Sequence, residues 1–211
     1  MSGIWAVIPL KPFSKAKSRL AHALSPEQRQ QLAERCFRHV LSVAQNAPQV
    51  VGTLVISRDT KALAIAREYG AKTVHETGAT SDLNSALTVA TGVVNSWKGK
   101  GILILPADLP MVTRDDLADM VMLGREMYSV VIATDHNEDG TNAMLIRPPG
   151  LFEYGYGAGS FRRHLTRAQV AGAHVHVYRS ERLALDIDVP ADLALYEQLL
   201  HERDETHRET M

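Results

Sequence analysis

Cysteine is nearly absent from this chain, since Cys36 is the only one among its 211 residues. A disulfide within the chain is therefore excluded, and this favours a reducing location such as the cytoplasm. Cys36 stands beside Phe37 in a helical pattern. We expect it to be buried in the core, with a reactive thiol as the alternative.

Long apolar runs and an excess of one charge are also missing. No run approaches the roughly 20 apolar residues that a membrane-spanning helix needs. The apolar stretch near the start has no basic segment before it, unlike a secretion signal. Lys and Arg total 23 against 24 Asp and Glu, which gives a formal charge of −1. This balance predicts neither a nucleic-acid partner nor a membrane partner.

The chain does contain a regular alternation of apolar runs and helical patterns. Strands are expected at residues 4–10, 53–58, 71–76, 101–106 and 129–134. Helices are expected at residues 25–47, 59–70, 82–97 and 113–127. Ser25, Asp82 and Thr113 are typical N-cap residues for three of these helices. Strands separated by helices predict an α/β fold, with a mostly parallel sheet covered by helices on both faces.

The pattern changes in the last third of the chain. Apolar runs flank Asp139-Gly140, a turn signal that predicts a hairpin or a longer excursion. A strand-like piece follows at residues 174–180, and a final helix is expected from about Pro190. We therefore expect a mixed sheet with antiparallel strands late in the chain. The organisation predicted is one domain over residues 1–200 and a polar tail over residues 201–211.

An aspartate follows the fourth predicted strand. In GILILPADLP (101–110), four aliphatic residues precede Pro106 and Asp108. Ligands bind at the carboxyl ends of strands in an open parallel sheet, and a carboxylate there is a good ligand for Mg²⁺. The alternative is that Asp108 caps a turn or the following helix.

A second acidic motif occurs in LALDIDVP (183–190). Asp186 and Asp188 are two residues apart, so on an extended chain both carboxylates point to one face. Solvent or a bridging cation would relieve their repulsion. Alternatively, Asp188 caps the final helix. Together with Asp108, this pair favours a metal site.

The loop after the first strand is suited to an anion. LKPFSKAKSRL (10–20) contains Lys11, Lys15, Lys17 and Arg19, and no acidic residue occurs before Glu27. Polyphosphate lies at this position in nucleotide-binding α/β folds, although neither the P-loop nor the G-x-G-x-x-G pattern is present. A solvated basic loop is the alternative.

Two later turns are further candidates for anion binding. Glycines alternate in YGYGAGSFRRHL (154–165) before a helical stretch at Ser160, so backbone amides at a helix start would be open to an anion. Ser160 would cap this helix or donate to a ligand oxygen. A plain glycine turn is the alternative. In DGTN (139–142), Thr141 and Asn142 would equally serve only to satisfy the backbone of the turn.

These segments together resemble one family. The resembling stretches are VIPLKPFSKAKSRL, LPADLP, DGTNAMLIRP, YGYGAGSFRRHL and LALDIDVPADL, which follow the family's order from Val7 to Leu193. The family is that of the small guanylyltransferases that make the phospholactyl or phosphoenolpyruvyl guanosine intermediate of coenzyme F-420 biosynthesis. The resemblance implies a GT-A-like fold, of the nucleotide-diphospho-sugar transferase type. It also implies transfer of GMP from GTP to a three-carbon phosphoacid, with release of pyrophosphate.

The resemblance assigns roles to matching residues. It implies that one or two Mg²⁺ ions are held by Asp108, Asp186 and Asp188. It places the phosphate and carboxylate of the acceptor at Thr141, Gly157 and Ser160. The residues expected to contact the nucleotide are Lys11, Lys17, Arg19, Asn84 and Pro106. Asp108 and Lys17 are the expected catalytic residues. In TSDLNSAL (80–87), Asn84 fits the family pattern, whereas Asp82 stands where a glycine is more usual.

Two other functions remain open at this point. One is a different Mg²⁺-dependent nucleotidyltransferase, but such enzymes usually have a G-G-x-S-x-R-type loop where this chain has LKPFSKAKSRL. The other is a GTP-binding module without turnover, which three aspartates make less favoured. The sequence does not choose among phosphoenolpyruvate, 2-phospholactate and 3-phosphoglycerate as acceptor. A homodimer is the default expectation, since two-fold dimers are the commonest oligomers.

Overall fold

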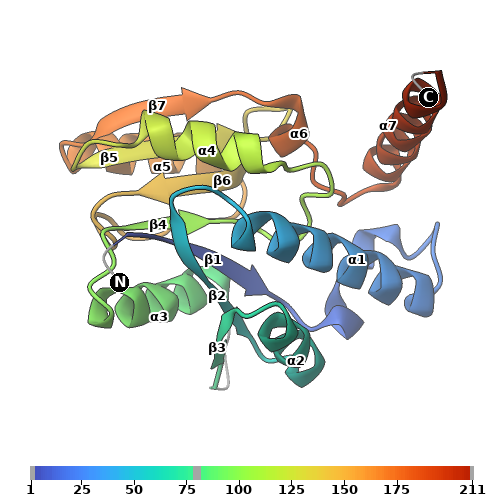
Figure 1. Cartoon of the computed structure of the whole chain (residues 1–211), viewed down its shortest axis with the longest axis horizontal. Helices are drawn as coiled ribbons and strands as arrows, with labels where there is room; N and C mark the ends of the chain where they lie inside the picture. The colour runs from blue at the N-terminus through green and yellow to red at the C-terminus, as the bar shows by residue number, and fades with distance from the viewer. Residues whose placement is uncertain (1–2, 78–81, 210–211) are drawn as a thin grey trace.

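The computed structural model describes residues 3–77 and 82–209 and contains a seven-stranded sheet of order β3-β2-β1-β4-β6-β5-β7 (Figure 1). Its parallel half consists of β1 (Ile4–Leu10), β2 (Val50–Ser57), β3 (Lys72–His75) and β4 (Gly101–Ile104). The chain proceeds outward from β1 to β3 and then returns to the other side of β1 to form β4. The strand order therefore reverses between β1 and β4, which is where open α/β sheets bind ligands.

An antiparallel strand separates this half from the rest of the sheet. β6 (Thr141–Ile146) lies between β4 and β5 (Ser129–Thr134) and runs opposite to both. β5 and β6 form the hairpin predicted around Asp139-Gly140, and β7 (His174–Tyr178) is parallel to β5. The prediction of a mixed, mostly parallel sheet is confirmed. Because β6 runs backwards, its first residues lie at the same edge as the last residues of β4 and β5.

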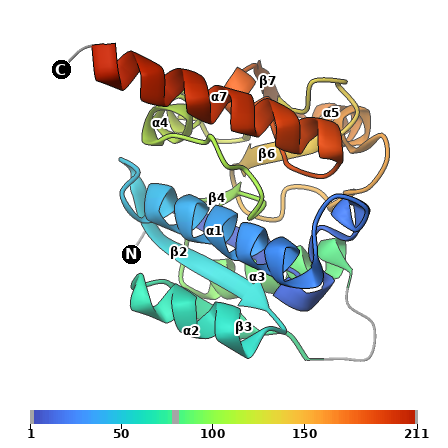
Figure 2. The same ribbon diagram turned by 90° about the vertical axis from the view of Figure 1, so that its right-hand side faces the viewer.

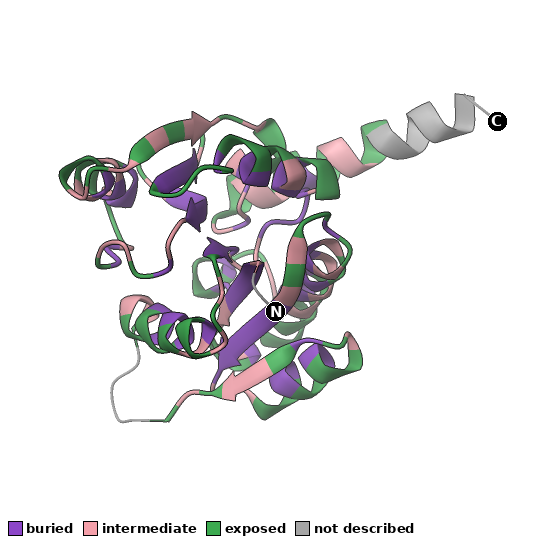
Figure 3. Ribbon diagram, turned by 60° about the vertical axis from the view of Figure 1, so that its left-hand side comes forward, coloured by how far each residue is buried: buried purple, intermediate pink, exposed green. Residues whose placement is uncertain are grey.

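Helices cover both faces of the sheet, as predicted. Residues of α1 (Pro26–Gln45), α2 (Thr60–Glu68), α4 (Arg114–Leu123) and α6 (Glu181–Ala184) enter the apolar core on one face. Residues of α3 (Leu83–Ser96) and α5 (Ser160–Val170) enter the core on the other. Buried positions accordingly line the central strands and the inner sides of the helices (Figure 3). The long aliphatic runs of the strands are explained by this double cover, because both sides of each strand face a core.

The predicted helix starts are also confirmed. Ser25 and Thr113 each form a capping box with the residue three positions later. The Asp82 side chain accepts hydrogen bonds from two amides at the start of α3. α4 ends at Leu123 rather than at the predicted residue 127, since Gly124 follows as its C-cap.

A long helix ends the described chain. α7 (Pro190–Glu209) begins at the predicted proline and continues through residues 201–209, which the sequence pattern assigns to a polar tail. Tyr196 packs with Leu32 and Cys36 of α1 in a third apolar cluster, and Figure 2 shows α7 on the same side of the molecule as α1. Cys36 is buried there, as expected. Among the described helices, none has the length and apolar character required to cross a bilayer.

Candidate active site

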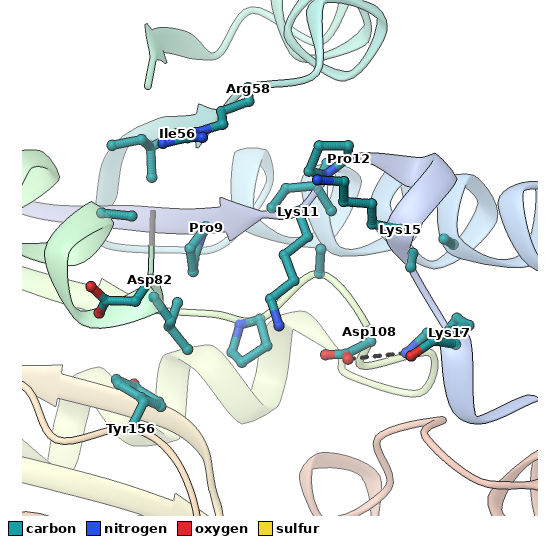
Figure 4. Close-up of a pocket in the computed structure, with 18 of the residues that line it drawn as sticks. Pro9, Lys11, Pro12, Lys15, Lys17, Ile56, Arg58, Asp82, Asp108 and Tyr156 are labelled. Carbon is teal, nitrogen blue, oxygen red and sulfur yellow. Dashed lines mark hydrogen bonds and ion pairs between the residues drawn. The ribbon is translucent and has the colours of Figure 1, made fainter. Parts of the chain in front are cut away.

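A cavity of about 580 Å³ lies at the carboxyl ends of β1, β2 and β4. Its walls come from the loop after β1, the start of α3, the loop after β4 and Tyr156 of the glycine-rich loop. Figure 4 shows Lys11 extending into the cavity and Lys17 directed at Asp108. The cavity is therefore located at the reversal of strand order, where a ligand is expected.

The basic loop after β1 is an ordered structure. Two short 3-10 turns shape it. Phe13 is buried against Phe37, and the Phe13 amide donates to the Asp59 carboxylate at 2.9 Å. Lys11 and Lys15 line the cavity from this loop. The backbone of the loop is thus anchored, while Lys11 and Lys15 remain exposed, so the anion site stays a prediction.

Lys17 lies against the acidic residues. Its backbone is in the left-handed region, with φ 54°, and its side chain is only 4% exposed. Lys17 Nζ is 3.0 Å from Asp108 Oδ2 and 3.8 Å from Asp188 Oδ1. Arg19 reaches Asp188 Oδ2 at 3.2 Å from the solvent side. The buried ammonium is thus paired, as a buried charge must be.

The three predicted aspartates converge in space. One carboxylate oxygen from each of Asp108, Asp186 and Asp188 lies within 4.8 Å of the others. Asp108 follows β4, whereas the other two follow α6, and the Ile187 amide joins the two segments by donating to the Asp108 carbonyl at 3.4 Å. The alternative that Asp188 caps the final helix is wrong. Asp188 lies two residues before the first residue of α7, and its carboxylate instead pairs with Lys17 and Arg19. Asp192, within the first turn of α7, accepts from the Asp188 amide at 2.8 Å.

Negative charge is concentrated at this cluster. Burial, and then repulsion by Asp108 and Asp188, raises the pKa of Asp186 to about 6. For Lys17, burial acts to lower the pKa, but attraction to Asp108, the hydrogen bond with it and attraction to Asp188 together raise it. Lys17 is therefore an ammonium ion. Both shifts show that the cluster favours a positive charge in its midst.

The donor set of this cluster fits a divalent cation. Three carboxylates provide oxygen ligands only, which hard cations such as Mg²⁺ prefer. Within the described ranges, no other group of three acidic, histidine or cysteine side chains comes close enough to share an ion. Asp108, Asp186 and Asp188 are thus the residues that would hold a metal.

Asn142 holds one of these aspartates, a role that the sequence analysis missed. Its Nδ2 donates to Asp186 Oδ1 at 3.2 Å and to a carbonyl of α6 at 2.9 Å. The pairing of β5 with β6 shifts in register between Ala133 and Thr134, which leaves Asn142 as an extra residue of β6. A bulge of this kind redirects the neighbouring side chains. The amides of the DGTN turn are instead satisfied by the Asp135 carboxylate.

The residues expected at the acceptor gather where β6 and α5 begin. Thr141 is buried, and its Oγ1 lies 2.9 Å from His164 Nδ1. Gly157 has φ +123°, and a Cβ there would meet no atom within 4 Å. Ser160 is buried as the first residue of α5, whereas the N-cap is Gly159, so the expectation that Ser160 caps the helix is wrong. The hydroxyl groups remain as hydrogen-bond donors at this position.

Two backbone amides at the start of α5 already donate hydrogen bonds to Asp139. Both Asp139 carboxylate oxygens lie 3.1 Å from the Gly159 amide, and the Asp139 carbonyl accepts from the Phe161 amide at 2.9 Å. The prediction that amides at this helix start are open to an anion is wrong for these two groups. An anion here would depend more on side-chain hydroxyls than on the helix terminus.

Asn84 and Pro106, both expected at the nucleotide, differ in placement. Pro106 lines the cavity directly. Asn84 instead binds the backbone of Tyr156, since its Oδ1 accepts from the amide at 2.7 Å and its Nδ2 donates to the carbonyl at 3.3 Å. It thereby ties the start of α3 to the glycine-rich loop. Residues 80 and 81 of the TSDLNSAL stretch lie outside the described residues.

Comparisons with known proteins agree with this geometry. The family model described as "Guanylyl transferase CofC like" matches residues 4–211. The phosphoenolpyruvate guanylyltransferase of Sphaerobacter thermophilus is 36% identical over 188 residues, which are 89% of each chain. The 2-phospho-L-lactate guanylyltransferase of Methanocaldococcus vulcanius is 31% identical over 89% of this chain and 81% of its own. A solved nucleotidyl transferase from Methanothermobacter thermautotroptrophicus shares the fold, with TM-score 0.68, 16% identity and coverage of 96% and 100%.

Proposed function

Because the chain belongs to the CofC-like guanylyl transferase family, we propose that it transfers GMP from GTP to phosphoenolpyruvate or 2-phospho-L-lactate, as a step of coenzyme F-420 biosynthesis. The chain is a nucleotidyltransferase, and the proposal concerns its two substrates and the residues that bind them. Pyrophosphate is the second product.

One observation supports this proposal above the others. Three carboxylates and a buried lysine meet at the reversal of strand order, and two of the carboxylates, Asp108 and Asp188, line a cavity whose remaining charges are mostly cationic. Lys11, Lys15 and Arg19 extend this basic side of the cavity. Such a surface is suited to a triphosphate together with a divalent cation, because phosphate oxygens complete the ligand shell of Mg²⁺.

The reaction needs charge stabilisation more than a strong base. A phosphate oxygen of the acceptor attacks the α-phosphorus of GTP, and the bond to the leaving pyrophosphate breaks. The attacking oxygen is already anionic at neutral pH, so no residue has to remove a proton from it. The barrier arises from repulsion between two anions and from charge on the pyrophosphate. Positioned cations reduce both contributions.

The lysines provide part of this stabilisation. Lys11 and Lys15 line the cavity and are placed to neutralise phosphate oxygens of GTP. Lys17 contacts Asp108 and lines the same cavity, so its ammonium group is suited to stabilise the negative charge that develops between donor and acceptor. Arg19 extends the basic surface toward solvent. A Mg²⁺ ion held by the three aspartates would add Lewis-acid polarisation of the phosphoryl oxygens.

The acceptor is assigned to the neighbouring position. Thr141 and Ser160 supply hydroxyl donors, and the open space at Gly157 admits a small ligand close to the backbone. Asn142 connects this position to the metal cluster through Asp186. The proposed reaction requires that a three-carbon phosphoacid bound here direct its phosphate at the nucleotide.

The test is pyrophosphate release from GTP with Mg²⁺, measured in parallel with phosphoenolpyruvate, 2-phospholactate and 3-phosphoglycerate. We expect release that depends on one of the first two. Asp108→Asn should lower turnover by about a hundredfold or more, since it removes a charged group of the catalytic centre. Asp115→Asn, on an exposed acid in the first turn of α4, is the matched control and should retain turnover.

Each other outcome has a definite meaning. Release that depends only on 3-phosphoglycerate would support transfer of GMP but contradict phosphoenolpyruvate and 2-phospholactate as the acceptor. GTP binding without release in any mixture would favour a non-catalytic nucleotide-binding module. Full turnover by a folded Asp108→Asn protein would contradict the assignment of the acidic cluster.

A further inference from the structure

His164 occupies an unusual position between two parts of the acceptor region. It lies in α5 with its side chain fully buried. Its Nδ1 is 2.9 Å from Thr141 Oγ1, and its Nε2 is 3.0 Å from the Gly155 amide nitrogen. The Tyr156 ring packs against it edge-on, with ring centroids 4.8 Å apart. The imidazole thus has one defined partner on each nitrogen.

These two contacts determine the tautomer of the ring. A backbone N–H can only donate, so His164 Nε2 must accept from Gly155. The ring proton of the neutral imidazole is then on Nδ1, which donates to Thr141 Oγ1. The ring is neutral because burial, together with Arg167 and Arg163 on the same helix, lowers the pKa of His164 to about 4.

The tautomer decides what the Thr141 hydroxyl offers to a ligand. A hydroxyl has one proton and two lone pairs. Because one lone pair accepts from His164, the proton of Thr141 is free to be donated to a third group. In the opposite tautomer, Nδ1 would take that proton and the hydroxyl would present only lone pairs. An anionic ligand has no proton to give, so only the first arrangement attracts it.

We infer that His164 is a positioning residue, which holds the Thr141 hydroxyl as a hydrogen-bond donor to the anionic acceptor. The inference rests on the proposed function, in which Thr141 contacts the phosphoacid. His164 itself does not need to touch the substrate. Its contribution is to fix the direction and the donor character of a hydroxyl that would otherwise rotate.

The partner that sets the tautomer is itself held in place. The Gly155 carbonyl accepts a hydrogen bond from Arg163, and the next residue, Tyr156, has both backbone groups bound by Asn84. Arg163 and Asn84 thereby hold the backbone in the position at which the Gly155 amide donates to His164 Nε2. This gives Asn84 of α3 an indirect connection to Thr141, with both its amide nitrogen and its oxygen engaged by the Tyr156 backbone.

Two substitutions of His164 separate this role from simple packing. The amide of asparagine lies at the position of Nδ1, so His164→Asn keeps a donor for Thr141 and loses the acceptor for Gly155. The amide of glutamine lies at the position of Nε2, so His164→Gln keeps the acceptor for Gly155 and loses the donor for Thr141. A packing role would not make His164→Gln the worse variant, because glutamine fills more of the ring's volume than asparagine does.

The expected results concern the KM for the phosphoacid. His164→Gln should raise it about tenfold, the loss typical of a hydrogen bond to a charged group, and leave the KM for GTP unchanged. His164→Asn should stay near the wild type. Thr141→Val should match His164→Gln, Thr141→Ser should retain function, and the double variant should be no worse than Thr141→Val alone.

Several outcomes would overturn the inference. Equal losses in both His164 variants, or a parallel rise in the KM for GTP, would indicate packing. The ring ¹⁵N chemical shifts of the wild-type protein give a test that needs no variant, since a proton on Nε2 contradicts the assignment. An inactive wild-type enzyme would refute the proposed function and the inference with it. A wild type that turns over while the variants depart from the expected pattern refutes the inference alone.

Discussion

Lys17 combines two features that each carry a cost. A left-handed backbone is unfavourable for a residue with a Cβ, and burial of an ammonium group is unfavourable unless it is paired. The turn at φ 54° is what directs the side chain to Asp108, 3.0 Å away, and toward Asp188. Strain of this kind is concentrated at functional sites, where the surrounding structure maintains it. The conformation of the loop after β1 therefore places the Lys17 ammonium group beside its acidic partners.

His164 gives the site a measurable dependence of stability on pH. The pKa of His164 is about 4 in the folded protein, lowered by burial and then by Arg167 and Arg163 from the ordinary histidine value of 6.5. The unfolded chain thus binds the proton more readily. The contribution of His164 to the free energy of unfolding is therefore fully present above about pH 6.5. It falls by up to about 3 kcal/mol as the pH decreases toward 4.

Denaturant unfolding at several pH values measures this contribution. Asp186 has a raised pKa and acts in the opposite direction, so the wild type alone does not isolate His164. The difference between the wild type and His164→Asn cancels the other groups. We expect this difference to shrink as the pH falls from about 6.5 to about 4. A difference that stays constant over this interval would show that the pKa of His164 is the same in the folded and the unfolded protein.

Among the elements, the short helix α6 positions part of the acidic cluster. It precedes the segment that contains Asp186 and Asp188, and it is fixed to α4 through Asp116. Asp116 is fully buried and accepts from Arg182 at 2.8 and 2.9 Å and from Ser180 Oγ at 2.7 Å. Burial opposes ionisation of Asp116, but these hydrogen bonds lower its pKa. The position of the acidic segment thus depends on this carboxylate.

Substitution of Arg182 tests that dependence. Arg182→Met leaves a buried carboxylate without its cation, which should cost about 2–3 kcal/mol of unfolding free energy, less than for a fully buried pair because Arg182 is half-exposed. It should also raise the Mg²⁺ concentration needed for half-maximal turnover. Arg179→Met is the matched control, since its ion pair with Glu138 is exposed and is worth at most about 1 kcal/mol. Equal effects of the two substitutions would contradict the anchoring role.

The sequence predicted most of these elements for physical reasons that are local. Aliphatic runs located the strands, and short polar side chains such as Ser25 and Thr113 located helix starts, because both signals depend on near neighbours in the chain. The acidic cluster was also predictable. The carboxyl ends of β1 and β4 had to lie at one edge, and Asp108 follows one of them.

The remaining parts of the site depend on contacts that no local pattern contains. Asn142 supports Asp186 because a one-residue bulge in β6 redirects it, and the spacing of apolar residues does not reveal that bulge. Asn84 fits a nucleotide-binding pattern but binds the backbone of a loop 72 positions away. His164 appeared only as one residue of a motif, since its role is defined by partners in β6 and the glycine-rich loop.

For the molecule as a whole, the acidic cluster is a source of instability that a cation would remove. Three carboxylates within 4.8 Å repel one another, and Lys17 compensates only part of this charge. A cation that binds the folded state alone increases its stability by mass action. We expect millimolar Mg²⁺ to raise the melting temperature by roughly 2–6 °C.

Asp186→Asn is the informative comparison for this thermal shift. It removes a charge from the cluster, so its melting temperature without Mg²⁺ should equal or exceed that of the wild type, and the shift with Mg²⁺ should be smaller. Differential scanning calorimetry in the absence of nucleotide measures both quantities. A wild type that Mg²⁺ does not stabilise would mean that the cation binds only together with a phosphate ligand.

Because β6 runs antiparallel to its neighbours, the proposed contacts to the two substrates come from two separate segments of the chain. The proposed nucleotide contacts come from residues 11–106, whereas the proposed acceptor contacts come from residues 141–160, delivered to the same edge by a strand that starts there. Acceptor preference can therefore diversify by exchange of one short cassette while the nucleotide half is conserved. Grafting residues 135–165 from a relative with a different acceptor is the natural route to altered product selectivity.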